Sequence, residues 1–294
     1  MKILITGASG FIGQYLIKEL SAEHEVLGLY LNGKLPRGNF KKARINLTEQ
    51  DKLQEAVLEF APDVLFHLAA ISKPAVAESL PLETVRKINV DATRVLAETC
   101  EKIGAKMIFF STDLVYDGEG KPFKKESEPL KPRSVYAKSK ADAEREVKSV
   151  FDNYVILRIA LHFGFGLNGT SSHFQEMFRS LEKKKPVKLF SDQYRTQLEV
   201  NESARMLEKL LRANVNATTL NFGGKERVSR YELGLMLAEI CGFDKNLIEP
   251  ILAEEILGKN NVKDVSLDVS KLAEVGIEAR PLEETLYEIC KNRK

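Results

Sequence analysis

The sequence predicts a doubly wound α/β fold, in which a parallel sheet carries helices on both faces. Short apolar runs of the kind that fill buried strands recur along the first 160 residues. Segments with the apolar spacing of a helix lie between most of these runs. The first run and its helix are joined by a turn with glycines at positions 7, 10 and 13. Strands that alternate with helices are typical of a parallel sheet with right-handed crossovers.

The elements follow one another without a gap up to about residue 160. We expect strands at residues 2–6, 25–30, 43–45, 63–68, 106–111 and 154–159. Helices are expected up to residue 20 after the glycine turn, and at residues 49–60, 82–103 and 135–150. A polar loop rich in Gly, Lys, Glu and Pro spans residues 117–133. We interpret residues 1–160 as one domain.

Beyond residue 160 the regular alternation ends. Helices are expected near residues 171–184, 201–213, 229–242 and 282–291, with short strands at residues 187–190 and 219–221. Residues 161–294 are therefore predicted to form a smaller, mostly helical C-terminal lobe. We expect part of its chain to return to the sheet.

Composition excludes several classes of partner. The chain has 294 residues, is 44% hydrophobic and 29% charged, and carries a formal net charge of only +2. This balance is typical of a globular protein and indicates no nucleic-acid partner. No apolar stretch approaches the ~20 residues that a membrane helix needs, and no signal peptide is visible, so no membrane partner is expected.

The three cysteines indicate a reducing compartment. Cys100, Cys241 and Cys290 are odd in number, far apart and without metal-ligand spacing. We interpret them as reduced thiols in helices and expect a cytoplasmic protein without a metal site.

The glycine turn is the first candidate site. Gly7 permits a tight turn, Gly10 lets a pyrophosphate approach the backbone, and Gly13 lets the helix lie close to the strand. The first N–H groups of the helix then face an anion. An ordinary turn that merely needs glycine is the alternative, but the position between the first strand and the first helix favours a dinucleotide site.

A second constellation follows the strand at residues 106–111. Tyr136 and Lys140 are four residues apart on one helix face, where an ammonium near a phenol favours the phenolate. Thr112 follows the strand at its carboxyl end, where ligands bind in open α/β sheets. Each feature is weak alone, but together with the glycine turn the three form a far more specific constellation.

With these motifs in place, the chain resembles the extended short-chain dehydrogenase/reductases, which combine a Rossmann domain with a Ser/Thr–Tyr–Lys site. Within them it is most similar to the dTDP-4-dehydrorhamnose reductases. The segments that carry the likeness are residues 7–13, 67–70, 88–90, 111–118, 134–140, 192–193, 223–232 and 268–282. The likeness therefore covers nearly the whole chain.

The resemblance implies a role for each matching residue. Thr112, Tyr136 and Lys140 would be catalytic, with Tyr136 protonating the C4 oxygen of a 4-keto sugar nucleotide as hydride arrives from the nicotinamide. The cofactor would contact Gly7, Ser9, Gly10, Phe11, Ile12, Gly13, Asn46, Leu47, Ala69, Ala70, Ile71, Tyr136 and Lys140. Asn89 resembles an asparagine that supports the lysine; a buried side chain that satisfies helix backbone is equally compatible.

The segment after the second strand favours NADP(H) over NAD(H). Residues 29–32 contain no Asp or Glu to accept the ribose hydroxyls, as NAD sites usually do. Lys34 and Arg37 follow and could pair with a 2′-phosphate, although loop cations that only aid solubility are the alternative.

Two departures from the family pattern put a thymidine-linked sugar in doubt. Asn46 stands where family reductases usually carry an aspartate. Leu161 stands where they commonly carry a tryptophan that stacks on thymine, and the chain contains no tryptophan. His162, Phe163 and Phe165 are the candidates to replace that platform.

Other functions remain open on the sequence alone. A dehydratase is disfavoured because Leu114, and not a glutamate, follows Asp113. A 4-epimerase would use the same tyrosine and lysine with tightly held NAD. A non-catalytic NADP-binding subunit, like the regulatory β subunit of methionine adenosyltransferase, would keep the nucleotide site. A homodimer is expected from the family alone.

Overall fold

A seven-stranded parallel sheet is the centre of the molecule. The computed structural model describes residues 1–258 and 261–292. The strands lie in the order β11-β6-β5-β4-β1-β2-β3. Their bounds are Lys2–Thr6 (β1), Glu25–Tyr30 (β2), Lys41–Arg44 (β3), Val64–His67 (β4), Lys106–Thr112 (β5), Tyr154–Ile159 (β6) and Thr218–Phe222 (β11). All neighbours pair in parallel, so the predicted doubly wound fold is confirmed.

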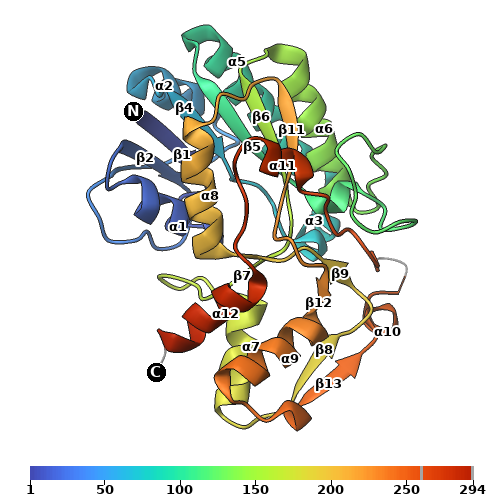
Figure 1. The fold of residues 1–294 in the computed structure, drawn as a ribbon. Coiled ribbons are helices and arrows are strands. Elements are labelled where there is room, and N and C mark those ends of the chain that lie inside the picture. Colours follow the sequence, from blue (N-terminus) through green and yellow to red (C-terminus); the bar gives the residue numbers. More distant parts are fainter. Residues whose placement is uncertain (259–260, 293–294) are drawn as a thin grey trace.

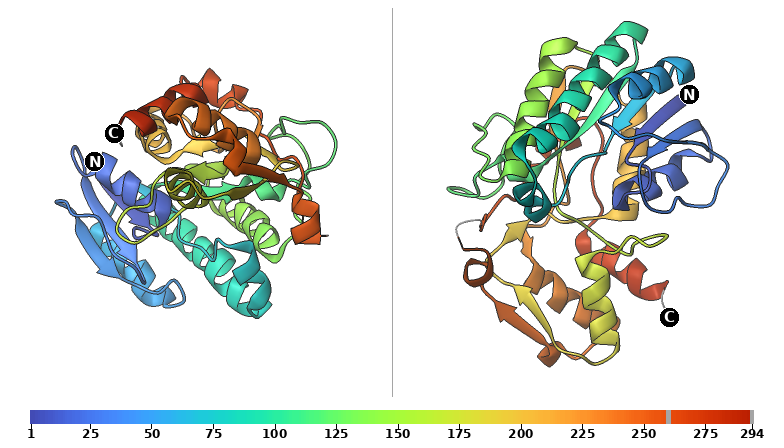
Figure 2. Two further views of the ribbon diagram at one scale, coloured as in Figure 1. Left: turned by 90° about the horizontal axis from the view of Figure 1, so that it is seen from below. Right: turned by 180° about the vertical axis from the view of Figure 1, so that it is seen from behind.

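Helices cover both faces of this sheet (Figure 1). One face carries α2 (Gln50–Phe60), α5 (Ala92–Ile103) and α6 (Val135–Val150); the other carries α1 (Phe11–Leu20), α8 (Val200–Arg212) and α11 (Ser270–Glu274), as Figure 2 shows from behind. Alternate strand residues point to opposite faces, so Ile3 and Ile5 pack on the α1 side and Leu4 on the α2 side. Strands buried on both faces need continuous apolar runs.

The order of the strands places a switch point between β1 and β4. From β1 the chain continues outward to β2 and β3, whereas β4, β5 and β6 extend in the other direction. In open α/β sheets a ligand binds beyond the carboxyl ends of the strands at this point.

The predicted helix over residues 82–103 contains a wide turn. It consists of α4 (Leu82–Arg86), a π-helical turn (Lys87–Asp91) and α5, and a short helix α3 (Pro74–Ser79) precedes it. The apolar spacing predicted one regular helix, since a single wide turn leaves no mark on that spacing. The turn contains Asn89, whose polar contacts are described below. Such turns are frequent at functional sites.

The C-terminal lobe contains α7 (His173–Glu182), α9 (Arg230–Cys241), α10 (Ala253–Leu257) and α12 (Leu282–Lys291). Three short strand pairs accompany them: β7 (His162–Phe163) with β10 (Leu198–Glu199), β9 (Tyr194–Arg195) with β12 (Val228–Ser229), and β8 (Val187–Phe190) with β13 (Ile248–Ile251). In contrast, α8 packs on α1 and β11 pairs with β6, so these later segments belong to the sheet layers. The division at residue 160 stays a prediction.

None of the helices within the described ranges has both the length and the apolar character needed to cross a bilayer.

The prediction of three reduced thiols is wrong for two of them. Cys241, at the end of α9, and Cys290, in α12, form a disulfide with a Cα–Cα distance of 5.5 Å. Cys100 is free and buried. The pairing was hidden in the sequence because the two cysteines are 49 residues apart and meet only where α9 packs against α12.

Removal of this disulfide should destabilise the C-terminal lobe. We expect Cys290→Ser to lower the free energy of unfolding by about 2–4 kcal/mol under non-reducing conditions, because the cross-link restricts the unfolded chain. Urea denaturation with and without reductant measures the effect, and reductant should lower the wild-type value toward that of the variant. Three reactive thiols in denatured, unreduced wild-type protein would contradict the disulfide.

Candidate active site

A cavity of about 470 Å³ lies beyond the carboxyl ends of the central strands. Its lining includes these predicted residues: Gly7, Ser9, Gly10, Phe11, Ile12, Gly13, Asn46, Leu47, Ala69, Ala70, Ile71, Tyr136 and Lys140. Three other predicted residues are not in the lining: Lys34 and Arg37 are exposed in the loop after β2, and Thr112 is buried at the end of β5. The structure thus brings most of the predicted residues to one cavity.

The glycine turn forms a close-fitting wall of this cavity. Gly7 has a φ of +71°, and its carbonyl accepts a hydrogen bond of 2.9 Å from the Gly10 N–H. A Cβ atom on Gly13 would lie 2.2 Å from the Gly7 carbonyl oxygen, so no larger residue fits there. Helix α1 therefore begins directly behind the turn, where its first N–H groups suit a phosphate.

A buried chain of hydrogen bonds holds the loop after β4. The backbone N–H groups of Leu68 and Ala69 both donate to the Thr6 hydroxyl, at 3.1 Å. That hydroxyl must then donate to His67 Nδ1, at 2.7 Å, which leaves the Nε2–H of His67 to donate to Thr93 at 3.0 Å. Burial holds the pKa of His67 well below its ordinary value, so the imidazole is neutral, as this pattern requires.

Asn89 continues this support toward the helix that carries the tyrosine. Its side-chain oxygen accepts from the Ile71 N–H at 2.8 Å, and its amide donates to the Ser139 hydroxyl at 2.9 Å. Ser139 in turn donates to the Tyr136 carbonyl at 2.7 Å. Asn89 thus contacts the cavity loop directly and the α6 backbone through Ser139. Ser139 is the neighbour of Lys140 in the chain, so Asn89 supports the helix turn that carries Lys140 and not the ammonium group itself.

Tyr136 and Lys140 line the cavity, and Thr112 follows the lining residue Ser111 at the end of β5. The Thr112 side chain is close enough to the Tyr136 phenol to act on its pKa. The Lys140 ammonium lies 4.0 Å from the centre of the Phe109 ring. Burial raises the pKa of Tyr136 above its ordinary range; the nearby Thr112 hydroxyl opposes this and the Asp113 charge adds to it.

The spacing predicted that the Lys140 ammonium lowers the pKa of Tyr136. In this structure burial of the two side chains outweighs that effect. Burial lowers the pKa of Lys140 to about 7, with the Glu144 carboxylate acting in the opposite direction. A lysine that is only partly charged near neutral pH offers little charge to the phenol. Desolvation of both groups therefore dominates, and Tyr136 is protonated at neutral pH.

A buried ion pair beneath the site was missed in the sequence. Arg158 binds the Glu144 carboxylate through two hydrogen bonds, at 2.8 and 3.0 Å, and Ser111 donates to the same carboxylate at 2.6 Å. Both charged side chains are at most 3% exposed. The sequence did carry one signal for this pair: Arg158 lies inside the apolar strand at residues 154–159. Since a buried charge requires a partner, an acidic side chain could have been expected next to it.

A second ion pair joins the two parts of the chain beside Thr112. Asp113 follows β5, Arg195 comes from β9, and their side chains are 3.3 Å apart and buried. Thr112 donates to the other Asp113 oxygen at 3.2 Å. Burial raises the pKa of Asp113 to about 6, against the opposing effect of Arg195. The sequence contains no local signal for this contact.

Comparison with known proteins identifies the family. The family model described as the RmlD substrate binding domain matches residues 1–294. The chain belongs to the RmlD substrate-binding domain family. This confirms the resemblance to extended short-chain dehydrogenase/reductases of the dTDP-4-dehydrorhamnose reductase type.

Individual relatives have different functions. The methionine adenosyltransferase 2 subunit beta of Pongo abelii is 28% identical over 285 residues, which cover 95% of this chain and 84% of that protein. The structure of a dTDP-4-dehydrorhamnose reductase from Clostridium acetobutylicum is 25% identical, with a TM-score of 0.82 over 100% of this chain and 99% of that one. A structure of MoeE5 with UDP-glucuronic acid and NAD is 25% identical, with a TM-score of 0.82 over 100% of both chains.

The aromatic residues near Leu161 have structural contacts in this family member. His162 is hydrogen-bonded to the Ala160 carbonyl at 2.9 Å and to Ser203 at 2.8 Å, and burial lowers its pKa to about 4. Phe163 and Phe165 both pack their rings against Phe174 of α7. Phe163 and Phe165 are thus part of the packing of the C-terminal lobe, whereas His162 contacts α8 of the sheet layers.

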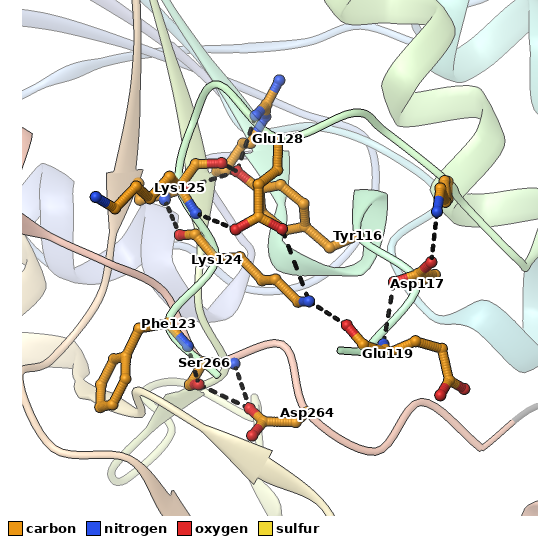
Figure 3. Close-up of polar contacts among 12 residues, drawn as sticks. Tyr116, Asp117, Glu119, Phe123, Lys124, Lys125, Glu128, Asp264 and Ser266 are labelled. Atoms are coloured by element: carbon orange, nitrogen blue, oxygen red, sulfur yellow. Dashed lines mark hydrogen bonds and ion pairs between the residues drawn. The ribbon is translucent and has the colours of Figure 1, made fainter. Parts of the chain in front are cut away.

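The polar loop at residues 117–133 is attached to the segment before α11 (Figure 3). The backbone N–H groups of Phe123 and Lys124 donate to Ser266, at 2.9 and 2.7 Å. The buried Lys124 ammonium donates to the Glu119 carbonyl and lies 3.7 Å from the Glu128 carboxylate, next to a polar cavity of about 190 Å³. The loop is thereby held in place beside the end of β5.

The low pKa of Lys140 should make stability depend on pH. In the unfolded chain Lys140 has the ordinary lysine pKa of 10.5, and in the folded chain its pKa is about 7. Between these two pH values this side chain therefore carries a proton in the unfolded chain but not in the folded one. The contribution of Lys140 to the free energy of unfolding should therefore rise with pH in this interval, by about 1.4 kcal/mol per unit.

Urea denaturation at pH 7 and pH 9 of the wild type and Lys140→Met measures this effect. Wild-type stability should increase relative to the variant as the pH rises. Lys138→Met, which removes an exposed lysine from the same helix, should follow the wild type. Parallel pH profiles of wild type and Lys140→Met would contradict the assignment.

Proposed function

We propose that the chain is an NAD(P)H-dependent reductase of a 4-keto sugar nucleotide. The observation that carries the proposal is the joint position of Tyr136 and Lys140 in the same cavity as the glycine turn, with Thr112 near the tyrosine. Family membership and the reductase structure support this reading. Sugar nucleotides are supported as ligands by the MoeE5 complex with UDP-glucuronic acid.

The cavity fits a nicotinamide dinucleotide. The close approach at Gly10 and Gly13 leaves backbone N–H groups for the pyrophosphate, with Ser9, Phe11 and Ile12 alongside. Asn46 and Leu47 would border the adenine, and residues 69–71 the ribose next to the nicotinamide. When bound, the reduced cofactor supplies the hydride.

The protein supplies the proton and the orientation. Tyr136 carries its phenol proton at neutral pH and gives it to the C4 oxygen as the carbonyl becomes an alcohol. Thr112 directs the carbonyl oxygen toward the phenol, and Lys140 binds the nicotinamide ribose. The low-dielectric surroundings strengthen each of these contacts.

We also propose a preference for NADP(H). The end of β2 is followed by Leu31 and Asn32, both in the cavity lining, and neither is an acid that would bind free ribose hydroxyls. Lys34 and Arg37 add positive charge to the next turn. We expect a lower KM for NADPH than for NADH, measured at a fixed concentration of sugar nucleotide. A lower KM for NADH would contradict the preference.

The decisive assay is NADPH oxidation with a panel of 4-keto sugar nucleotides that differ in sugar and nucleotide. We expect one of them to be consumed. Tyr136→Phe should lower turnover by about 10²–10⁴-fold, because it removes the general acid. Cofactor affinity, measured by fluorescence titration, should stay close to the wild-type value. Unchanged turnover in Tyr136→Phe would exclude Tyr136 from this role.

A second candidate is a non-catalytic, NADP-binding regulatory subunit. The identity of 28% with methionine adenosyltransferase 2 subunit beta favours it. In that case NADPH binds but no member of the panel is consumed. Addition of the chain would then change the activity of a methionine adenosyltransferase. Homodimerisation and a cytoplasmic location remain predictions from the sequence.

A further inference from the structure

We propose that Arg44 binds the 2′-phosphate of NADP(H) and thereby determines the cofactor preference of the cavity. This inference rests on the proposed function, because it concerns the same dinucleotide site. It names a residue that the sequence did not single out, since Arg44 is separated from the end of β2 by a loop of ten residues, 31–40.

Strand pairing places Arg44 at the cavity edge. It is the last residue of β3 and lies opposite Tyr30, the last residue of β2. The chain after each strand enters the cavity lining, as Leu31 and Asn32 on one side and as Ile45 and Asn46 on the other. In a Rossmann fold the end of β2 is where the ribose of the adenosine is bound.

The guanidinium of Arg44 is anchored at this edge. Its Nε donates to the Leu31 carbonyl at 2.9 Å, and the neighbouring Asn32 carbonyl accepts from the Ser9 hydroxyl at 2.5 Å. The contact holds the side chain next to the lining. Among the described residues neither terminal amino group has a hydrogen-bond partner, so both remain for a ligand and match the fork that an arginine offers to a phosphate.

The charge of Arg44 is not neutralised by the protein. In the part of the chain that the structure describes, no carboxylate forms an ion pair with Arg44, whereas Lys41 on the same strand pairs with Glu25 at 2.7 Å. Lys34, Arg37 and Arg44 are all exposed and outside the cavity lining itself. Arg44 is distinguished from the two loop cations by its hydrogen bond to the cavity residue Leu31.

Calorimetric binding of four nucleotides to the full chain tests the inference without any need for turnover. The probes are NADPH, NADH, adenosine 2′,5′-bisphosphate and AMP. Arg44→Gln should weaken binding of the two 2′-phosphorylated probes by about 10- to 100-fold, the effect of a lost hydrogen bond to a charged group. Affinity for NADH should change by less than about twofold, which also shows that the variant is folded.

Lys42→Gln is the matched control. Lys42 is exposed on the same strand, two residues before Arg44 and opposite Gly28. Its replacement by Gln therefore removes one positive charge, as Arg44→Gln does, but farther from the cavity edge. It should leave all four affinities within about twofold of the wild type. An equal effect of Lys42→Gln and Arg44→Gln would show a general charge effect and overturn the inference.

Two further results would also overturn it. One is a selective loss of NADPH affinity in Lys34→Gln/Arg37→Gln with no such loss in Arg44→Gln. The other is a wild-type preference for NADH. If the chain binds neither NADPH nor NADH, the proposed cofactor site is overturned together with the role of Arg44. If it binds NADPH but reduces no sugar nucleotide, the result counts against the reductase, and the comparison of Arg44→Gln with Lys42→Gln still decides this inference.

Discussion

The candidate site depends on one buried series of hydrogen bonds that runs from β1 to α6. Thr6 of β1 binds His67 of β4, His67 binds Thr93 of α5, and Thr93 donates to the backbone of Asn89. The Asn89 side chain then reaches the loop at Ile71 and, through Ser139, the turn of helix that carries Tyr136. Each donor in the series has an acceptor, as burial demands. The series therefore relates the strand before the glycine turn to the tyrosine helix.

Burial of charge is the second constraint on the site. Lys140 and Glu144 lie one helical turn apart on the inner face of α6, and Arg158 from β6 pairs with Glu144. The carboxylate balances the arginine and raises the pKa of the lysine against desolvation, which still lowers it to about 7. An unpaired charge in this position would be strongly unfavourable. The site therefore keeps its lysine able to change protonation state near neutral pH, next to the buried Arg158–Glu144 pair.

Much of the fold could be predicted because the signals were local. The apolar runs of β1, β2, β5 and β6 fill strands buried on both faces, and the predicted bounds match to within one residue. The glycine spacing predicted the close approach of Gly13 to Gly7, which depends on neighbouring residues only. The two-residue strands of the C-terminal lobe were missed because two residues have no measurable periodicity. The π-helical turn was missed because apolar periodicity carries no signal for one wide turn, and Asn89 in that turn contacts Ile71, 18 residues away.

The sequence by itself determined the order of strands and helices, the glycine turn and the helix face shared by Tyr136 and Lys140. These follow from backbone geometry and apolar periodicity over a few residues. Only the tertiary structure decided that burial dominates the pKa values of Tyr136 and Lys140. The same holds for the contact of Cys241 with Cys290, and for Arg195, which reaches Asp113 across 82 positions of the sequence. The tertiary structure also decided that Arg44, and not a cation of the loop after β2, is held by Leu31. Such contacts arise from the packing of distant segments, and burial strengthens their electrostatics in a way that no short sequence window contains.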